Sequence, residues 1–150
     1  MNIILTLLLF FNLGGARQDS SCRCRKAPPD EITLGSSTLV DLRPQRIAKV
    51  NGQVLAYGDI PLEDVLVEVF TRPDLRSWTA RSSPAMERRQ KRVGACLTGE
   101  NGNFCISGIH AGKYELRVSK SGLTLVSGVI IVDPRRKIGA KLVVHMSMAI

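Results

Sequence analysis

Hydrophobic and polar residues alternate in short runs along the chain from about residue 47 onward. The clearest run is 65–70, in which Val65, Val67 and Val69 would share one face of an extended strand. A second run, 112–119, places apolar side chains at every other position in the same way. A period of two residues is typical of strands with one buried face, so both runs predict half-buried β-strands.

Further segments alternate or are continuously apolar, and clusters of Gly, Pro and Asn separate them. No stretch between them has the 3.6-residue period of a convincing helix. Six or seven short strands without helices predict an all-β chain folded as an antiparallel β-sandwich. Besides the two runs above, the expected strands are 47–56, 93–98, 103–107, 124–132 and 138–148.

The dipeptide Asn101-Gly102 stands between two of these expected strands. Asn-Gly flanked by alternating segments is a strong signal for a tight two-residue turn. We therefore expect 93–98 to pair with 103–107 as a β-hairpin.

The N-terminus predicts a secretory signal peptide. Residues 1–16 carry no charged side chain, and the apolar run 3–13 is much shorter than the roughly 20 residues that span a bilayer. Small residues at 14–16 suit cleavage after Ala16, so the mature chain would begin at Arg17. No second apolar run is long enough to stop transfer. We expect an exported protein, periplasmic, in the cell envelope or extracellular, with no transmembrane segment after cleavage.

Three regions follow from these patterns. Residues 1–16 are the signal peptide, and 17–46 form a polar tail with a candidate edge strand over 31–42, which Pro44 would end. Residues 47–150 form the sandwich, interrupted by a long basic insert at 72–92. About 134 mature residues suffice for one ordinary domain.

The net charge of +8 is concentrated in two segments, +5 over 72–92 and +3 over 133–141. Such segments either attract an anionic partner or are solvated loops and strand ends. Aromatic residues for base stacking are not interleaved with them, which argues against nucleic acid. The expected partner is a protein, or an anionic polysaccharide or surface. The candidate contacts form the densest cluster: Arg88, Arg89, Lys91 and Arg92.

Four cysteines in an exported chain predict disulfides, because Cys22-Arg-Cys24 lacks the Cys-x-x-Cys spacing usual for structural zinc. A turn at Asn101-Gly102, or one residue earlier, puts Cys96 and Cys105 on one face of the expected hairpin, so we predict that they bond. Cys22 and Cys24 would then bond each other or stay available to another chain. The competing connectivity joins these two tail cysteines to the two hairpin cysteines.

Several motifs follow one another between about residues 47 and 148: Gly52-Gln-Val54, Pro61-Leu62, the alternation 65–69, the turn 98–104, Gly112-Lys-Tyr114-Glu-Leu116-Arg-Val118 and Ser121-Gly122. In this order they resemble the carboxypeptidase regulatory-like domain, a transthyretin-like or prealbumin-like β-sandwich with an immunoglobulin-like fold. The resemblance implies a non-catalytic module of exported and cell-envelope proteins.

The residues themselves also argue against an enzyme. A zinc peptidase needs two histidine ligands and a carboxylate, but neither His110 nor His145 begins a His-x-x-Glu pair. No serine stands in a Gly-x-Ser-x-Gly frame. We therefore predict no catalytic, cofactor or metal site.

Carbohydrate binding is the alternative function. Sandwiches of similar topology include sugar-binding modules, which stack aromatic rings on the sugar. Trp78, in the basic insert, is the candidate stacking residue.

Overall fold

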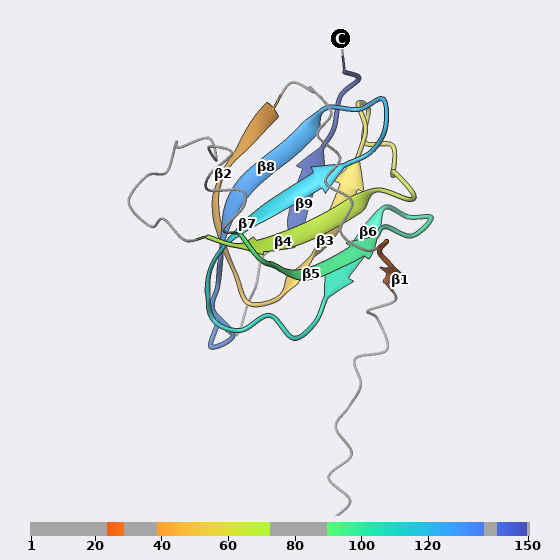
Figure 1. Cartoon of the computed structure of the whole chain (residues 1–150). Coiled ribbons are helices and arrows are strands. Elements are labelled where there is room, and N and C mark those ends of the chain that lie inside the picture. Colours follow the sequence, from red (N-terminus) through yellow and green to blue (C-terminus); the bar gives the residue numbers. More distant parts are fainter. Residues whose placement is uncertain (1–23, 29–38, 73–89, 137–140, 150) are drawn as a thin grey trace, which may run out of the picture.

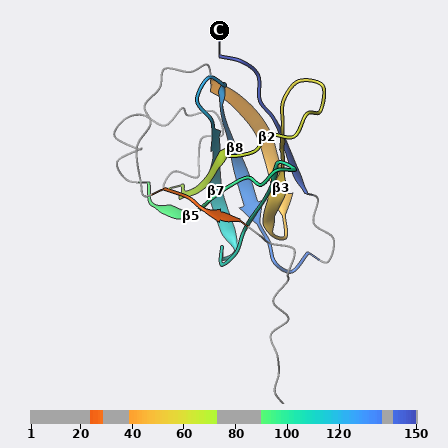
Figure 2. The same ribbon diagram turned by 90° about the vertical axis from the view of Figure 1, so that its right-hand side faces the viewer.

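The computed structural model describes residues 24–28, 39–72, 90–136 and 141–149. Regular structure in these residues consists of nine β-strands, and they contain no helix. The strands form two sheets that face each other, as the two perpendicular views show (Figures 1 and 2). The predicted all-β sandwich is confirmed. In the described part of the chain there is thus no helix of the length and apolarity needed to cross a bilayer.

The larger sheet has six strands and the smaller sheet has three. In spatial order the large sheet consists of β1 (Arg25–Lys26), β5 (Arg92–Leu97), β4 (Leu66–Thr71), β7 (Gly112–Ser119), β8 (Leu125–Val132) and β2 (Leu39–Ile47). The small sheet consists of β6 (Asn103–Ile106), β3 (Val50–Leu55) and β9 (Leu142–His145).

Both sheets are mixed, which corrects the expectation of a purely antiparallel sandwich. β2 runs parallel to β8 in the large sheet, and β3 runs parallel to β9 in the small one. The reason lies in the connections: β2 and β8 end at the same end of the sandwich, and each then crosses to the other sheet. The parallel pair of β2 and β8 in the large sheet is therefore followed by the parallel pair of β3 and β9 in the small sheet.

The expected hairpin between β5 and β6 is wrong. β5 pairs with β4 and β1 in the large sheet, whereas β6 pairs with β3 in the small sheet. Gly102 between them has φ +68°, and its carbonyl oxygen accepts a hydrogen bond from the Val54 N–H at 2.9 Å. The turn is thus bonded to β3, and the chain passes from one sheet to the other instead of folding back on itself.

The core lies between the two sheets. Val65, Val67 and Val69 are each 0% exposed, so the predicted inner face of this run is confirmed. Burial of such side chains is worth about 25 cal/mol per Å² of apolar surface and is the main stabilising contribution. Partners come from both sheets, among them Ile47, Val54, Phe104, Leu116, Val118, Val126, Ile130, Leu142, Val144 and Met146.

β2 forms one edge of the large sheet. It overlaps the segment 31–42, in which the sequence indicates an edge strand, and residues 31–38 of that segment lie outside the described residues. The strand continues past Pro44, where its register with β8 shifts between Leu42 and Gln45. A proline at a bulge of an edge strand removes no ladder hydrogen bond, so it does not end the strand.

The loops divide between the two ends of the sandwich. At one end β2 passes to β3, β6 to β7 and β8 towards β9, and these turns lie together at the bottom of Figures 1 and 2. β4 ends and β5 begins at the same end, because Phe70 is opposite both Arg92 and Glu115 near the start of β7. The opposite end carries the connections 56–65, 98–102 and 120–124.

Candidate functional site

A disulfide anchors the N-terminal tail to the edge of the large sheet. Cys24 is bonded to Cys96, with their Cα atoms 5.5 Å apart, and the two residues after Cys24 form β1 against β5. The Cys24 sulfur also lies 3.9 Å from the Leu97 carbonyl oxygen, but a disulfide sulfur has no proton to donate. The tail therefore covers part of the β5 edge.

The predicted bond between Cys96 and Cys105 is wrong, and the competing connection of the tail to this region is present instead. Cys96 points into the core opposite Val67, whereas Cys105 lies on β6 in the other sheet, on the face opposite the buried Phe104 and Ile106. Cys105 is disulfide-bonded as well. Cys22 lies outside the described residues.

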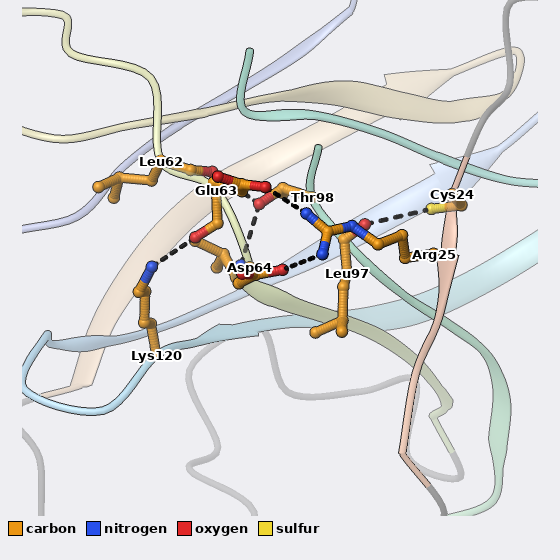
Figure 3. A network of polar contacts seen from close by, with 9 residues as sticks. Cys24, Arg25, Leu62, Glu63, Asp64, Leu97, Thr98 and Lys120 are labelled. Carbon is orange, nitrogen blue, oxygen red and sulfur yellow. Dashed lines mark hydrogen bonds and ion pairs between the residues drawn. The ribbon is translucent and has the colours of Figure 1, made fainter. Parts of the chain in front are cut away.

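Charged groups reinforce the tail beside this disulfide (Figure 3). The Arg25 guanidinium contacts the Asp64 carboxylate at 3.1 Å and also pairs with the Glu63 carboxylate. Lys120 donates to the Glu63 carbonyl oxygen from the neighbouring connection. All three side chains of the ion pairs are about half exposed, so they contribute little stability compared with the covalent bond.

Thr98 holds the connection between β3 and β4 in place. Its buried hydroxyl donates to the Leu62 carbonyl oxygen at 2.6 Å and accepts from the Val65 N–H at 3.0 Å. Its backbone bonds Asp64 and Val65 in addition. Asp64 has φ +55°, a strained value for a residue with a side chain, and the hydrogen bonds with Thr98 hold its backbone in this conformation.

A polar network covers the outer face of the large sheet. The Glu115 carboxylate accepts hydrogen bonds from Arg117 Nε at 2.8 Å, from Ser127 Oγ at 3.0 Å and from the Gln90 amide. Arg117 also donates to the Gln90 side-chain oxygen, and its guanidinium lies 4.4 Å from the centre of the Phe70 ring. The side chains of Glu115 and Arg117 are only 13% and 20% exposed.

The pKa of Glu115 is lowered by this network. Burial is the largest single effect and raises the pKa, but the hydrogen bond and charge of Arg117, with the bonds from Gln90 and Ser127, together outweigh it. The group is a stable carboxylate at neutral pH. A general base works best with a pKa near the working pH, so this arrangement is suited to holding strands together and poorly suited to proton transfer.

The histidines do not form a catalytic or metal-binding arrangement with their described neighbours. His110 is exposed, and its carbonyl oxygen accepts from the Tyr114 hydroxyl at 3.1 Å. His145 Nδ1 lies 3.9 Å from the Asp59 carboxylate, and both side chains are exposed. Within the described ranges no group of three His, Cys, Asp or Glu residues could hold a metal ion.

The structure describes two of the four residues expected to contact anions, Lys91 and Arg92. Lys91 is exposed. Its carbonyl oxygen accepts a hydrogen bond from the Thr71 N–H, and its N–H donates to the Thr71 hydroxyl. Arg92 is half-buried and bonds the Glu68 carboxylate at 3.0 Å and the Pro28 carbonyl oxygen at 2.9 Å, so it has a structural role. Arg88, Arg89 and the proposed stacking residue Trp78 lie outside the described residues.

The fold places the described ends of the two basic segments at one end of the sandwich. The segment 72–92 connects β4 to β5, and 133–141 connects β8 to β9, both at the end where β2 passes to β3. Basic residues from other parts of the sequence lie at the same end. The sequence alone did not show this cluster, because it depends on how the strands are connected. We give the name basic end to six of the described cations there: Arg46, Lys49, Lys113, Arg135, Arg136 and Lys141.

Comparison with models of known protein families and with curated proteins finds no match for this chain. The resemblance to the carboxypeptidase regulatory-like domain therefore stays a prediction.

Proposed function

We propose that this protein is an exported, non-catalytic β-sandwich module with a structural or interaction role at the cell envelope or outside the cell. The Cys24–Cys96 disulfide supports export, since disulfides persist in oxidising compartments and are rare where thiols are kept reduced. The predicted signal peptide agrees with this location.

The observation that carries the interaction role is the unequal charge of the two ends. Loops at the ends of a rigid sandwich are the usual place for binding residues. The basic end gathers six cationic residues, with Asp133 and Glu115 as acidic residues among its described neighbours. At the opposite end four acidic residues, Asp59, Glu63, Asp64 and Glu100, outnumber three basic ones, Arg25, Lys26 and Lys120. Such a field attracts and orients an anionic partner.

The non-catalytic part of the proposal rests on how the polar groups are used. Glu115, the described acid with a lowered pKa, is bonded on both carboxylate oxygens, and Glu68 is paired with Arg92. These two carboxylates hold neighbouring strands of the large sheet together.

Cell fractionation with N-terminal sequencing tests the proposal. We expect the protein outside the cytoplasmic membrane, beginning at Arg17, with cysteines that alkylating reagents modify only after reduction. Cytoplasmic protein that begins at Met1 and carries reactive thiols would refute it.

A further inference from the structure

The basic end continues around the sandwich from one outer face to the other. On the large sheet Arg46 and Lys113 are both opposite Ile131, one on each side of β8. Residues directly opposite each other point to the same face, and neighbouring strands lie about 4.8 Å apart. Their backbones are therefore about 10 Å apart on the outer face of the large sheet.

The turn after β8 carries the next two cations. The Arg135 N–H bonds the Asp133 carboxylate at 3.2 Å, and the Arg136 N–H bonds the Asp133 carbonyl oxygen at 3.1 Å. Arg136 Nη1 then donates to the Arg46 carbonyl oxygen at 3.1 Å. The turn is thus fixed against β2, and both arginine side chains are exposed at the tip of the sandwich.

The last members lie on the side of the small sheet. Leu142 is buried and Val143 is exposed, so alternation places Lys141 on the outer face of that sheet. Lys49 occupies the turn between β2 and β3. Lys49 and Lys113 each have a further interaction within the protein. We therefore expect Arg46, Arg135, Arg136 and Lys141 to make the main contacts with an anion.

We propose that the basic end binds a linear anionic polysaccharide carrying sulfate or carboxylate groups. The cations lie on the outer faces of two sheets whose backbones are about 10 Å apart, and on the tip between these faces. A flexible chain can follow such a curved band and contact all of it. A flat bilayer or a stiff nucleic-acid duplex contacts only the tip.

The apolar residues favour the same choice. Membrane-binding surfaces combine basic residues with apolar side chains that enter the bilayer. Among the described residues, the most exposed aromatic side chain, Tyr57, and the exposed Ile60 lie in the connection at the opposite end. Near the basic end the exposed apolar side chains are the short Val93 and Val143, which reach less far into a bilayer than an aromatic or leucine side chain. Single-stranded nucleic acid needs aromatic stacking, and the six residues of the basic end supply charge alone.

This inference rests on the proposed function, because an exported module is the kind of protein that meets extracellular polysaccharide. Its test uses the purified, oxidised mature chain, with heparin as the sulfated probe and polygalacturonate as the carboxylated probe. Affinity is measured by calorimetry over a series of salt concentrations. Vesicles of phosphatidylcholine and phosphatidylserine, and oligothymidylate, are the competing ligands.

Two double variants with the same change in net charge locate the site. Arg135→Gln/Lys141→Gln removes two cations from the basic end, and Lys26→Gln/Lys120→Gln removes two from the opposite end. A cation close to an anionic surface contributes on the order of fivefold to affinity, so we expect the first variant to lose roughly tenfold or more. The affinity of the control variant should stay within about twofold of the wild-type affinity. The wild-type affinity should fall as the salt concentration rises.

Equal losses in the two variants would show binding governed by net charge and overturn the proposed site. Absence of polysaccharide binding, or tighter binding to vesicles or oligothymidylate, would overturn the proposed ligand. An exported, disulfide-bonded protein that fails these tests would leave the proposed function standing and remove only this inference. Thermal unfolding of each variant shows whether it is folded.

Discussion

Cys24 is covalently bonded to Cys96, 72 residues further along the chain, and this bond fixes the N-terminal tail to the edge of the large sheet. The tail contributes only two residues of strand there, Arg25 and Lys26, before Pro28. A proline cannot donate to a strand ladder, which limits the hydrogen bonds available to β1. The disulfide is therefore the main attachment of the tail among the described contacts.

Removal of this bond should destabilise the protein. A disulfide that closes a loop of this length restricts the unfolded chain and contributes about 2–4 kcal/mol. We expect Cys24→Ala/Cys96→Ala to lower the free energy of unfolding by this amount in urea titrations. Arg25→Gln, which keeps the bond and removes only exposed ion pairs, should cost less than about 1 kcal/mol. Equal effects of the two changes would contradict this ranking.

Peptide mapping should identify both disulfides. Trypsin cleaves after Arg23 and a glutamate-specific protease cleaves after Glu100, so the four cysteines fall on four different peptides. Without reduction we expect Cys24 linked to Cys96 and Cys22 linked to Cys105. A peptide joining Cys96 to Cys105 would restore the connectivity that the hairpin suggested and would contradict the structure.

The inner faces of the strands could be predicted from the sequence. The alternation around Val67 and the apolar positions Leu142, Val144 and Met146 are buried as expected. Burial of one face depends on the local period of two, which each strand carries in its own sequence.

The partners of the strands could not be predicted in the same way. Asn101-Gly102 specifies a sharp turn, and the turn is present, but a tight turn can either return within a sheet or pass to the facing sheet. The choice depends on Gly102 packing beneath Val54, some 48 residues earlier. For the same reason cysteine spacing did not give the disulfides, and the basic end appeared only when the connections were known.

Gly102→Ala should test this packing. A Cβ atom at Gly102 would lie 2.4 Å from the Val54 carbonyl oxygen, and its φ of +68° strains any residue with a side chain. We expect a loss of stability of more than about 1 kcal/mol, measured by urea unfolding. Gly99→Ala in the same turn is the matched control, because a Cβ there meets nothing within 4 Å. A harmless Gly102→Ala would mean that the turn is not held against β3.

Thr98→Val should show the contribution of the buried hydroxyl. Valine has a similar shape but leaves the Leu62 carbonyl oxygen and the Val65 N–H without this partner. An unsatisfied buried polar group costs about 1–3 kcal/mol, so we expect a loss in that range in the same measurement. Thr98→Ser keeps the hydroxyl and should cost less. If serine proves as damaging as valine, packing of the methyl group, and not the hydrogen bonds, explains the role of Thr98.

Glu115 should make stability depend on acid pH. Burial raises its pKa, but Arg117, Gln90 and Ser127 stabilise the carboxylate more, so its pKa in the folded protein is below the ordinary value of 4.5. A lowered pKa contributes stability that is fully present above the ordinary value and is lost as the pH falls through the folded value. We expect Glu115→Gln to lose about 1–3 kcal/mol at neutral pH, because charged hydrogen bonds are removed. The difference in the free energy of unfolding between variant and wild type should narrow progressively below pH 4.5.

Urea unfolding at a series of pH values measures this difference. As a control, Glu100→Gln, in an exposed turn, should change stability by no more than about 0.5 kcal/mol at neutral pH. A difference that widens on acidification would mean that the folded protein raises this pKa and that the network does not stabilise the carboxylate.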